Sequence, residues 1–248
     1  MLLSYFFYIL LGFAPSLIWL LFYLRKDAHP EPKTQVLRIF AWGMIIAPLA
    51  VVFELVLFWL TVPATNFTSI ISMLDKLNDG WRATLTLVVF APLVEEYLKY
   101  RIVRTEIIKN SHFDEPLDAM LYLIIGALGF AAVENLIIVL KAPLMPLSQA
   151  FGTIGFRFLG ATFLHALSSG IVGYFLAKSF LKTKKRFPLL ILGLGIAVIL
   201  HGVYNYLITL TATDPEATFL IAILLLSMAF FVSYEFKRLK KYLSVCKL

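Results

Sequence analysis

The chain has 248 residues, 60% of them apolar, a formal net charge of +7 and a mean hydropathy of +0.87. Soluble domains use about 45–50% apolar residues, so this composition predicts an integral membrane protein. The single cysteine, Cys246, excludes an intrachain disulfide and a cysteine-ligated metal site. A positive net charge can indicate a nucleic-acid partner, but here the basic residues flank the apolar runs, as membrane topology requires. No nucleic-acid partner is therefore expected.

Seven apolar runs are long enough to cross the hydrocarbon core of a lipid bilayer, which is about 30 Å thick and takes about 20 helical residues. In chain order they cover 2–24, 39–62, 83–103, 117–140, 151–177, 188–210 and 216–235. Only helices and closed barrels satisfy their backbone hydrogen bonds in lipid. The sequence therefore predicts an all-α fold, a polytopic transmembrane bundle of seven helices that forms one integral membrane domain over residues 1–248.

The Lys and Arg residues set the orientation of this bundle. If the first run ends on the inside, only Lys76, Arg82, Lys141 and Arg157 of the 22 basic residues fall on the outer side. The positive-inside rule then predicts an N-terminus outside the cell and a C-terminus in the cytoplasm. On the outer side, apolar residues recur at helical spacing over 67–77, which predicts either a short helix on the membrane surface or a packed loop.

Ionisable residues inside the predicted helices are the candidates for function, because a charge at mid-helix costs about 2.5–3.5 kcal/mol on insertion scales. The third helix carries Pro92-Leu-Val-Glu95-Glu96-Tyr-Leu-Lys99. Adjacent helical residues point about 100° apart, so we expect one glutamate to act as a base and the other to be held by a neighbouring helix. Lys99 either pairs with Glu95 or extends to the cytoplasmic head groups. Pro92 removes a backbone hydrogen bond and should loosen the turn just above it.

The fourth predicted helix combines small residues with a carboxylate and an amide. Gly126, Gly129, Ala131 and Ala132 precede Glu134 and Asn135. Small residues allow another helix to approach closely, so the two polar groups are expected at a helix interface. The alternative is a tight interface with Glu134 near the outer head groups, since it lies about 8 Å from the outer boundary at 1.5 Å per residue.

The fifth and sixth predicted helices each contribute a histidine at similar depth. Arg157 and His165 lie on one face of the fifth helix, and His201 and Asn205 are one turn apart in the sixth. A lone membrane histidine is usually a hydrogen-bonded core residue, but two of them near three glutamates favour one shared site. For Glu54, a further carboxylate in the second helix, structural pairing and catalysis both stay open.

These residue types allow two kinds of hydrolytic chemistry. In the first, a glutamate takes a proton from water, and histidine and asparagine donors hold the developing oxyanion. In the second, His165, His201 and Glu134 bind a catalytic zinc ion while Glu95 acts as the base. The sequence has no HExxH motif, the strongest sequence signal for such a zinc site, and both alternatives stay open.

Two non-hydrolytic classes of protein also use buried charges. A proton- or ion-coupled transporter builds relays from Glu and His, but the sequence shows no matched halves with paired broken helices. A non-catalytic membrane scaffold would keep the charges for packing and would tolerate Glu95→Gln, which preserves shape while removing the base.

Five segments, in this order, make the chain resemble the PrsW family of bacterial intramembrane proteases, within the broader superfamily of CAAX prenyl endopeptidase-like membrane proteins. They are the stretch from Ala14-Pro15-Ser16 to Lys33, Glu95-Glu96-Tyr-Leu-Lys99, Gly129-Phe-Ala-Ala-Val-Glu134-Asn135, Arg157 with His165-Ala166, and His201-Gly-Val-Tyr-Asn205. Lys99 follows Glu96 by three residues, where CAAX enzymes usually have arginine one position later, so the PrsW branch is favoured.

The resemblance implies a multi-pass protease in the cell membrane of a bacterium. Its implied substrate is a membrane-embedded or single-pass protein, such as an anti-sigma factor, cleaved near the extracytoplasmic side. The family is often called a metalloprotease, whereas related CAAX-type enzymes are also described with a glutamate mechanism and no catalytic metal. Zinc as a cofactor therefore stays open at this stage.

The resemblance also implies roles for individual residues. Glu95 is the implied base and Glu96 a supporting carboxylate. His165 and His201 are implied to orient water, bind the oxyanion or bind a metal, with Asn205 assisting His201. The remaining polar residues of these motifs are implied to support the site: Lys99, Glu134, Asn135 and Arg157.

Overall fold

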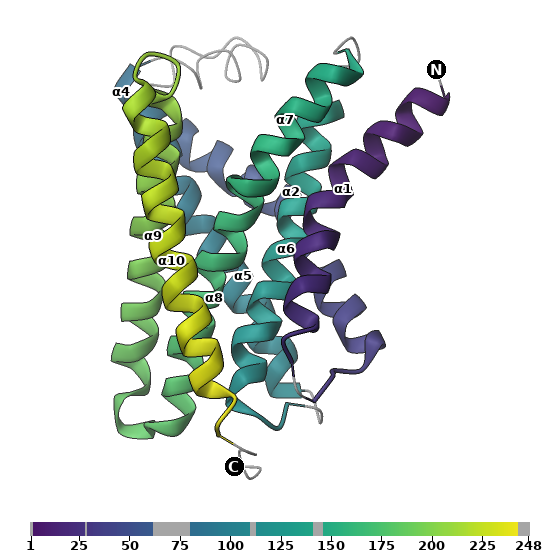
Figure 1. Ribbon diagram of the computed structural model, residues 1–248. Helices are drawn as coiled ribbons and strands as arrows, with labels where there is room; N and C mark the ends of the chain where they lie inside the picture. Colours follow the sequence, from purple (N-terminus) through teal and green to yellow (C-terminus); the bar gives the residue numbers. More distant parts are fainter. Residues whose placement is uncertain (1, 28, 62–79, 110–112, 141–145, 243–248) are drawn as a thin grey trace.

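The computed structural model describes residues 2–27, 29–61, 80–109, 113–140 and 146–242, and every regular element in these ranges is a helix. In chain order the elements are α1 (Leu2–Leu24), α2 (Lys33–Thr61), α4 (Gly80–Leu85), the π-helix η2 (Thr86–Phe90), α5 (Ala91–Lys109), α6 (Pro116–Leu140), α7 (Leu147–Leu159), α8 (Ala161–Leu181), the short 3-10 helix η3 (Thr183–Lys185), α9 (Arg186–Leu210) and α10 (Pro215–Leu239). They form one bundle (Figure 1), which confirms the predicted all-α fold.

Seven segments run along the bundle, as the sequence predicts. Six of them are long and apolar enough to cross a membrane: α1, α2, α6, α7 with α8, α9, and α10. The seventh is the continuous run of α4, η2 and α5, whose middle carries the ionisable residues of the third predicted helix. Several helices extend beyond their predicted ends, because hydropathy marks the lipid-crossing part of a helix and a helix continues into charged sequence.

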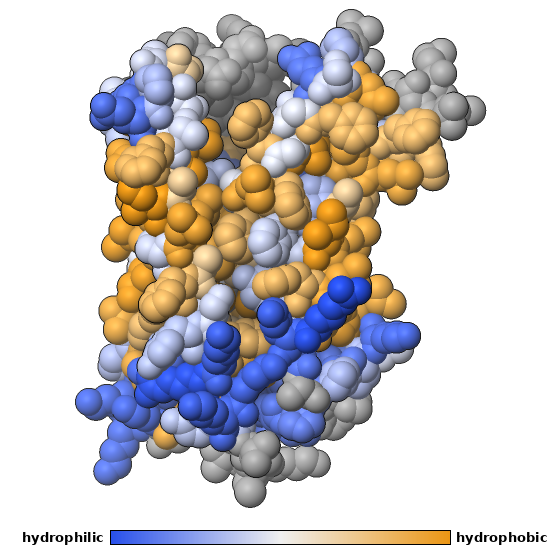
Figure 2. Space-filling view, viewed as in Figure 1, coloured by the Kyte–Doolittle hydropathy of each residue, from blue (hydrophilic) through white to orange (hydrophobic). Residues whose placement is uncertain are grey.

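Hydrophilic residues gather at one end of the molecule, as the blue band in Figure 2 shows, and α10 ends there with Lys237 and Arg238 in its last turn. The C-terminus lies at this end and the N-terminus at the other (Figure 1). This distribution agrees with a cytoplasmic C-terminus under the positive-inside rule. Of the basic residues predicted outside, Lys76 and Lys141 lie beyond the described residues, as does the segment 67–77, whereas Arg82 is on α4 and Arg157 on α7.

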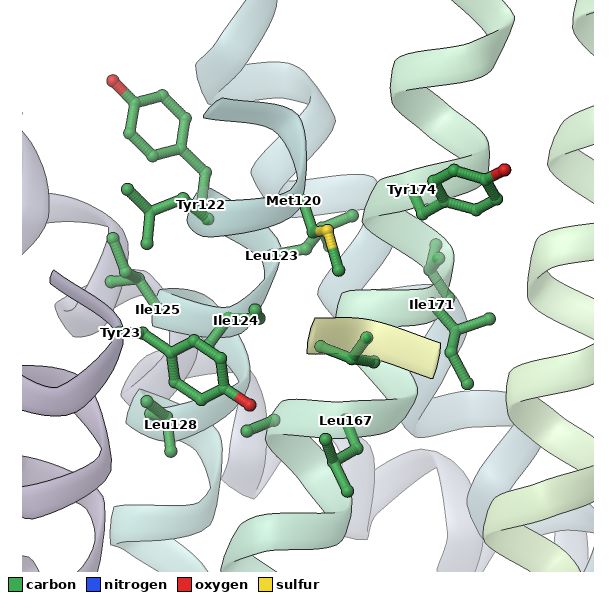
Figure 3. Close-up of a cluster of buried hydrophobic side chains, with 14 of the residues drawn as sticks. Tyr23, Met120, Tyr122, Leu123, Ile124, Ile125, Leu128, Leu167, Ile171 and Tyr174 are labelled. Carbon is green, nitrogen blue, oxygen red and sulfur yellow. The ribbon is translucent and has the colours of Figure 1, made fainter. Parts of the chain in front are cut away.

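Helix α6 is the centre of the bundle. Every residue from Pro116 to Ala132 is buried, because α1, α2, α5, α8 and α10 pack around it. A helix that is apolar on all sides is suited to this position. In Figure 3, Ile124 and Leu128 of α6 lie beside Leu167 and Ile171 of α8, in the largest cluster of buried apolar side chains.

The small residues of α6 let α2 approach at backbone distance, as predicted. A Cβ atom added at Gly129 would lie 2.0 Å from the carbonyl oxygen of Phe40, and one added at Gly43 would lie 2.0 Å from that of Gly126. Such close packing by small residues is typical of membrane helix pairs. It fixes the depth of α6, and therefore the depth at which Glu134 meets its neighbours.

The prediction of one continuous helix over 151–177 is wrong, because the helix breaks at Gly160. Gly160 has φ −101° and ψ −99° and separates α7 from α8. A break leaves the last carbonyl groups of α7 without helical donors. Trp19 of α1 satisfies one of them by donating its Nε1–H to the oxygen of Phe158 at 2.9 Å, while its ring stacks on Phe163 at a centroid distance of 4.2 Å.

The third predicted helix, 83–103, is also irregular, because it contains the π-helix η2. At the end of η2, the N–H of Ala91 donates to the oxygen of Thr86, five residues earlier. Pro92 follows at once, so the expectation that the turn above this proline is loosened is confirmed. Single π-turns inside α-helices occur frequently at functional sites.

The close contact between α2 and α6 generates a stability prediction. Gly129→Ala should lower the midpoint of unfolding in detergent, since the added methyl group meets the oxygen of Phe40 and overpacking costs about 1–3 kcal/mol or more. The matched control is Gly155→Ala on α7, where nothing lies within 4 Å of the added Cβ. Equal midpoints for the two variants would contradict the backbone contact between α2 and α6.

Candidate active site

The ammonium group of Lys99 lies at the centre of the polar cluster. Its side chain is 0% exposed, and Nζ lies 3.2 Å from Glu95 Oε2, 3.0 Å from Glu96 Oε1 and 2.8 Å from His165 Nδ1. Nζ also lies 4.4 Å from the ring centre of Phe130, a cation–π contact. Lys99 thus pairs with Glu95, and its alternative extension to the head groups is wrong. Its partners replace the water that a buried cation loses.

Glu96 is held by three helices and has no exposed surface. Its Oε1 accepts from Lys99, from Ser168 Oγ at 3.0 Å and from His201 Nδ1 at 3.0 Å, and its Oε2 accepts from Ser169 Oγ at 3.1 Å. Three of these donors share Oε1 and one binds Oε2, and the side chain of Glu96 is 0% exposed. Glu96 therefore ties α5 to α8 and α9 and is shielded from water.

Glu95 has a different environment. Its side chain is 8% exposed and lies at the wall of a cavity. Its hydrogen-bond donor among the described residues is Lys99, and its Oε2 lies 3.7 Å from His165 Nδ1 and 3.9 Å from His201 Nε2. The second carboxylate oxygen of Glu95 thus stays available to a ligand or a water molecule in the cavity.

The hydrogen-bond partners of the two histidines indicate which ring nitrogen carries the hydrogen. His165 Nδ1 faces the ammonium of Lys99 and must accept, so its Nε2 carries the hydrogen and donates to Glu134 Oε2 at 2.8 Å. His201 donates from Nδ1 to Glu96, which leaves the lone pair on its Nε2. The two rings meet edge to face, with centroids 5.1 Å apart. His165 is therefore neutral in this arrangement.

Polar contacts around Glu134 bridge the break between α7 and α8. Arg157 Nη2 donates to Glu134 Oε2 at 3.0 Å, the same oxygen that His165 contacts. Arg157 Nε donates to Asn135 Oδ1 at 2.5 Å, and Asn135 Nδ2 donates to Thr162 Oγ1 at 2.9 Å. Glu134 is therefore part of the cluster rather than a head-group residue, and Arg157 and His165 share a partner although a helix break separates them.

A cavity of about 650 Å³ lies against this cluster. Its volume is within the range of about 300–1,000 Å³ that is usual for ligand sites. The polar residues that line it are Glu54, Glu95, Glu134, Thr153, Arg157, His165, His201, Tyr204 and Asn205. Apolar side chains complete the wall, among them Val51 of α2, Ile137 of α6 and Phe156 of α7. The cavity can therefore hold both water and an apolar chain segment beside Glu95.

Two residues of this wall differ from what the sequence suggests. Glu54 of α2 makes no hydrogen bond or ion pair with any residue in the described part of the chain, so nothing there supports structural pairing for it. Asn205 donates from Nδ2 to the backbone oxygen of Leu87 in η2 at 3.0 Å, and not to His201. Its expected assistance to His201 stays a prediction.

Several members of the cluster are not among the residues that the sequence singles out. Ser168 and Ser169 follow His165 by three and four residues, so helical spacing alone could have placed them on its face. Thr162 and Tyr204 give no such signal, because the partner of a hydroxyl group depends on which helices pack together. The π-turn η2 has one local sign, namely Pro92 directly after it.

Comparison with known proteins identifies the family of the chain. Residues 31–234 match the family model described as "PrsW family intramembrane metalloprotease". The chain belongs to the PrsW family.

Curated relatives named "Protease PrsW" cover most of the chain. The relative from Bacillus subtilis is 30% identical over 80% of this chain and 81% of its own. Those from Geobacillus kaustophilus and Clostridioides difficile are 29% and 26% identical, over 79% and 96% of this chain and 77% and 92% of theirs. No solved structure gives a significant match. The protein is thus a multi-pass bacterial membrane protease of the PrsW type, as the sequence motifs indicate.

The family description names a metal, and four residues of the cluster carry atoms that could bind one. Glu95, Glu96, His165 and His201 each offer a ligand atom, and these atoms lie within 4.8 Å of one another. Their types suit zinc, which binds such atoms at about 2.0–2.2 Å. However, the ammonium of Lys99 lies within 3.2 Å of atoms on three of these residues and holds the place of a cation. The set does not fit an ion while Lys99 keeps this position.

The metal set expected from the sequence, His165, His201 and Glu134, meets a similar obstacle. His165 Nε2 and Glu134 Oε2 are hydrogen-bonded to each other, and Arg157 occupies the same oxygen. Both bonds would have to break before these two residues could share an ion. Zinc binding by this set stays a prediction.

The central position of Lys99 generates a prediction. Lys99→Met should lower the free energy of unfolding by about 3–5 kcal/mol, the usual cost of removing one partner from a buried ion pair. It should also abolish proteolysis, because Glu95, Glu96 and His165 lose their common donor. The measurements are detergent unfolding and cleavage of a membrane-anchored reporter. The control is Lys182→Met at the exposed end of α8, and equal stability of the two variants would contradict this account.

Proposed function

We propose that the protein is an intramembrane endopeptidase that hydrolyses a peptide bond in a membrane-embedded or single-pass protein of the anti-sigma-factor type, with Glu95 as the base. One observation carries the proposal. Of the two adjacent glutamates, Glu95 lines the cavity with a free oxygen, whereas Glu96 is surrounded by four donors. The membership of the PrsW family supports the class of reaction.

The attacking water is assigned to the space between Glu95 and His201. Oε2 of Glu95 keeps one lone pair beside its bond from Lys99, and it lies 3.9 Å from Nε2 of His201, too far for a direct hydrogen bond and suitable for one bridging water molecule. Both atoms are acceptors, because His201 carries its hydrogen on Nδ1. They can accept the two hydrogens of the water, which leaves an oxygen lone pair to attack the substrate carbonyl carbon.

Glu95 carries a proton between the two bond changes of the reaction. As the water oxygen bonds to the carbonyl carbon, Glu95 accepts one proton and the carbonyl oxygen becomes an oxyanion. Glu95 returns this proton to the amide nitrogen as the C–N bond breaks, giving a carboxyl group and an amine. A positioned base of this kind contributes about 10²–10⁴-fold to the rate.

Donors for the oxyanion are available in the same cavity. Tyr204 lines it and makes no hydrogen bond with another described residue, and Arg157 adds a positive charge. Removing one oxyanion donor in other hydrolases costs about 2.7–4 kcal/mol, so either group would matter. His165 supports the reaction by accepting from Lys99 and donating to Glu134, which fixes the two charged groups on either side of it.

The position of the site favours cleavage in the outer half of the membrane. Glu134 lies in the last two turns of α6, and Arg157 lies on α7, whose start is at the end opposite the hydrophilic band (Figures 1 and 2). A substrate segment there must expose its peptide bond, and its freed backbone groups need polar partners in lipid. The polar wall of the cavity supplies such partners.

The catalytic assignment generates a third prediction. Glu95→Gln should reduce cleavage of a single-pass reporter in proteoliposomes by about 10²-fold or more, because the amide cannot accept the proton. His201→Ala should cause a comparable loss, since the water loses its second acceptor. The matched control is Glu216→Gln on the exposed surface of α10, which should cleave at the wild-type rate. Full activity of a folded Glu95→Gln protein would contradict the role of Glu95 as the base.

Metal analysis of the same samples separates the two chemistries. If Glu95 and the histidines act on water alone, cleavage continues in the presence of a chelator. About one zinc per chain, lost together with activity in His165→Ala and His201→Ala, would contradict the proposal and support a metal-activated water instead.

A further inference from the structure

We infer that Asn205 is a positioning residue, which replaces the backbone hydrogen-bond donor that Pro92 lacks and so holds the π-turn that directs Glu95 to the cavity. The link to Glu95 rests on the proposed function, whereas the hydrogen bond itself does not. The inference gives the His201-Gly-Val-Tyr-Asn205 motif a role in backbone geometry, beyond contact with the substrate.

The first step is the hydrogen-bond register of η2. The N–H of Ala91 donates to the oxygen of Thr86, five residues earlier. In this register, the next oxygen, that of Leu87, would accept from residue 92. Residue 92 is proline, which has no N–H. The oxygen of Leu87 therefore has no helical donor in this register.

The second step is that a side chain from another helix supplies the donor. Asn205 Nδ2 lies 3.0 Å from the oxygen of Leu87, the distance of an ordinary N–H···O hydrogen bond. A backbone carbonyl without a partner is costly at membrane depth, and broken helices in membranes are re-satisfied by side chains of neighbouring helices. Asn205 does this for the carbonyl of Leu87, which has no donor in the π-register because residue 92 is proline.

The third step is that α9 contacts this turn at its backbone as well. A Cβ added at Gly202 would lie 2.2 Å from the oxygen of Val88, so any side chain there would push α9 away from η2. His201, the preceding residue, binds Glu96, which lies about two turns beyond Val88 on α5. Three residues of one motif thus contact three successive parts of the η2–α5 segment.

The geometry of Glu95 depends on the π-turn. A π-turn adds one residue to a helical turn, and one residue corresponds to a rotation of about 100° around the helix axis. If η2 relaxed to an α-helical register, α5 would rotate relative to α4 by about this angle. Because Glu95 and Glu96 both lie on α5, they would turn together, Glu95 away from the cavity wall and Glu96 away from its partners on α8 and α9.

The test uses Pro92→Ala, which restores the missing N–H. The full-length protein in lipid is compared as wild type, Asn205→Ala, Pro92→Ala and the double variant. Hydrogen–deuterium exchange reports on the backbone of residues 85–98, and kcat and KM are measured with a single-pass reporter. Asn205→Ala should raise exchange in this segment and lower kcat about tenfold or more, with KM nearly unchanged. Pro92→Ala alone should remain close to wild type.

The double variant, Asn205→Ala with Pro92→Ala, decides whether Asn205 replaces the donor that Pro92 lacks. If Asn205 replaces the missing donor, Pro92→Ala should return exchange in the Asn205→Ala protein toward wild type and restore most of kcat. The control is Pro188→Ala combined with Asn205→Ala, because Pro188 is in the first turn of α9 and its substitution frees no donor for Leu87. This control pair should stay as impaired as Asn205→Ala.

Two outcomes would overturn the inference. One is wild-type exchange over 85–98 in Asn205→Ala, and the other is a double variant as inactive as Asn205→Ala, as expected if the amide acts on the oxyanion. If no variant, wild type included, cleaves the reporter, the proposed function fails. The exchange measurement still decides whether Asn205 holds the turn.

Discussion

The structure depends on one buried cation. The ammonium of Lys99 is far from water, and an unpaired charge at that depth would be several kcal/mol too costly to keep. It is retained because Glu95, Glu96 and His165 surround it, and these residues belong to two different helices. The requirement that Lys99 be satisfied therefore fixes the relative position of α5 and α8. Each further bond to Glu96 and His165 then fixes another helix, α9 through His201 and α6 through Glu134.

The need to satisfy Lys99 also gives Glu95 and Glu96, two adjacent residues of the same type, different roles. Glu96 points toward α8 and α9, where Ser168, Ser169 and His201 donate to it, and it becomes a structural anion. Glu95 lies one residue earlier and therefore about 100° away, on the side of the cavity. A polar network in a low-dielectric interior is stable only when it is fully satisfied. Of the two glutamates, the network thus leaves Glu95 at the cavity wall and shields Glu96 from it.

The sequence predicts well those features that the membrane imposes on single residues. The placement of Lys and Arg predicts the helix number and orientation, and charges inside apolar runs identify Glu95, Glu96, His165 and His201 as one group. It does not predict features that arise when helices meet. The full burial of Lys99 required partners from α8, the break at Gly160 required Trp19 on α1, and the donor for Leu87 required an amide on α9. None of these is visible in a local pattern.

Both interruptions of regular helix lie at the cavity, and membrane physics explains why. Non-helical backbone at membrane depth is tolerated where protein covers it or where it lines a polar cavity. Leu87 of η2 and Ala161, directly after the break at Gly160, both line the cavity beside His201. The irregular turns give the cavity its width and its polar edge, and the side chains of Asn205 and Trp19 satisfy the carbonyl groups that they expose. A site that admits water within a bilayer thus requires interrupted helices, and the interruptions persist because residues of other helices complete their hydrogen bonds.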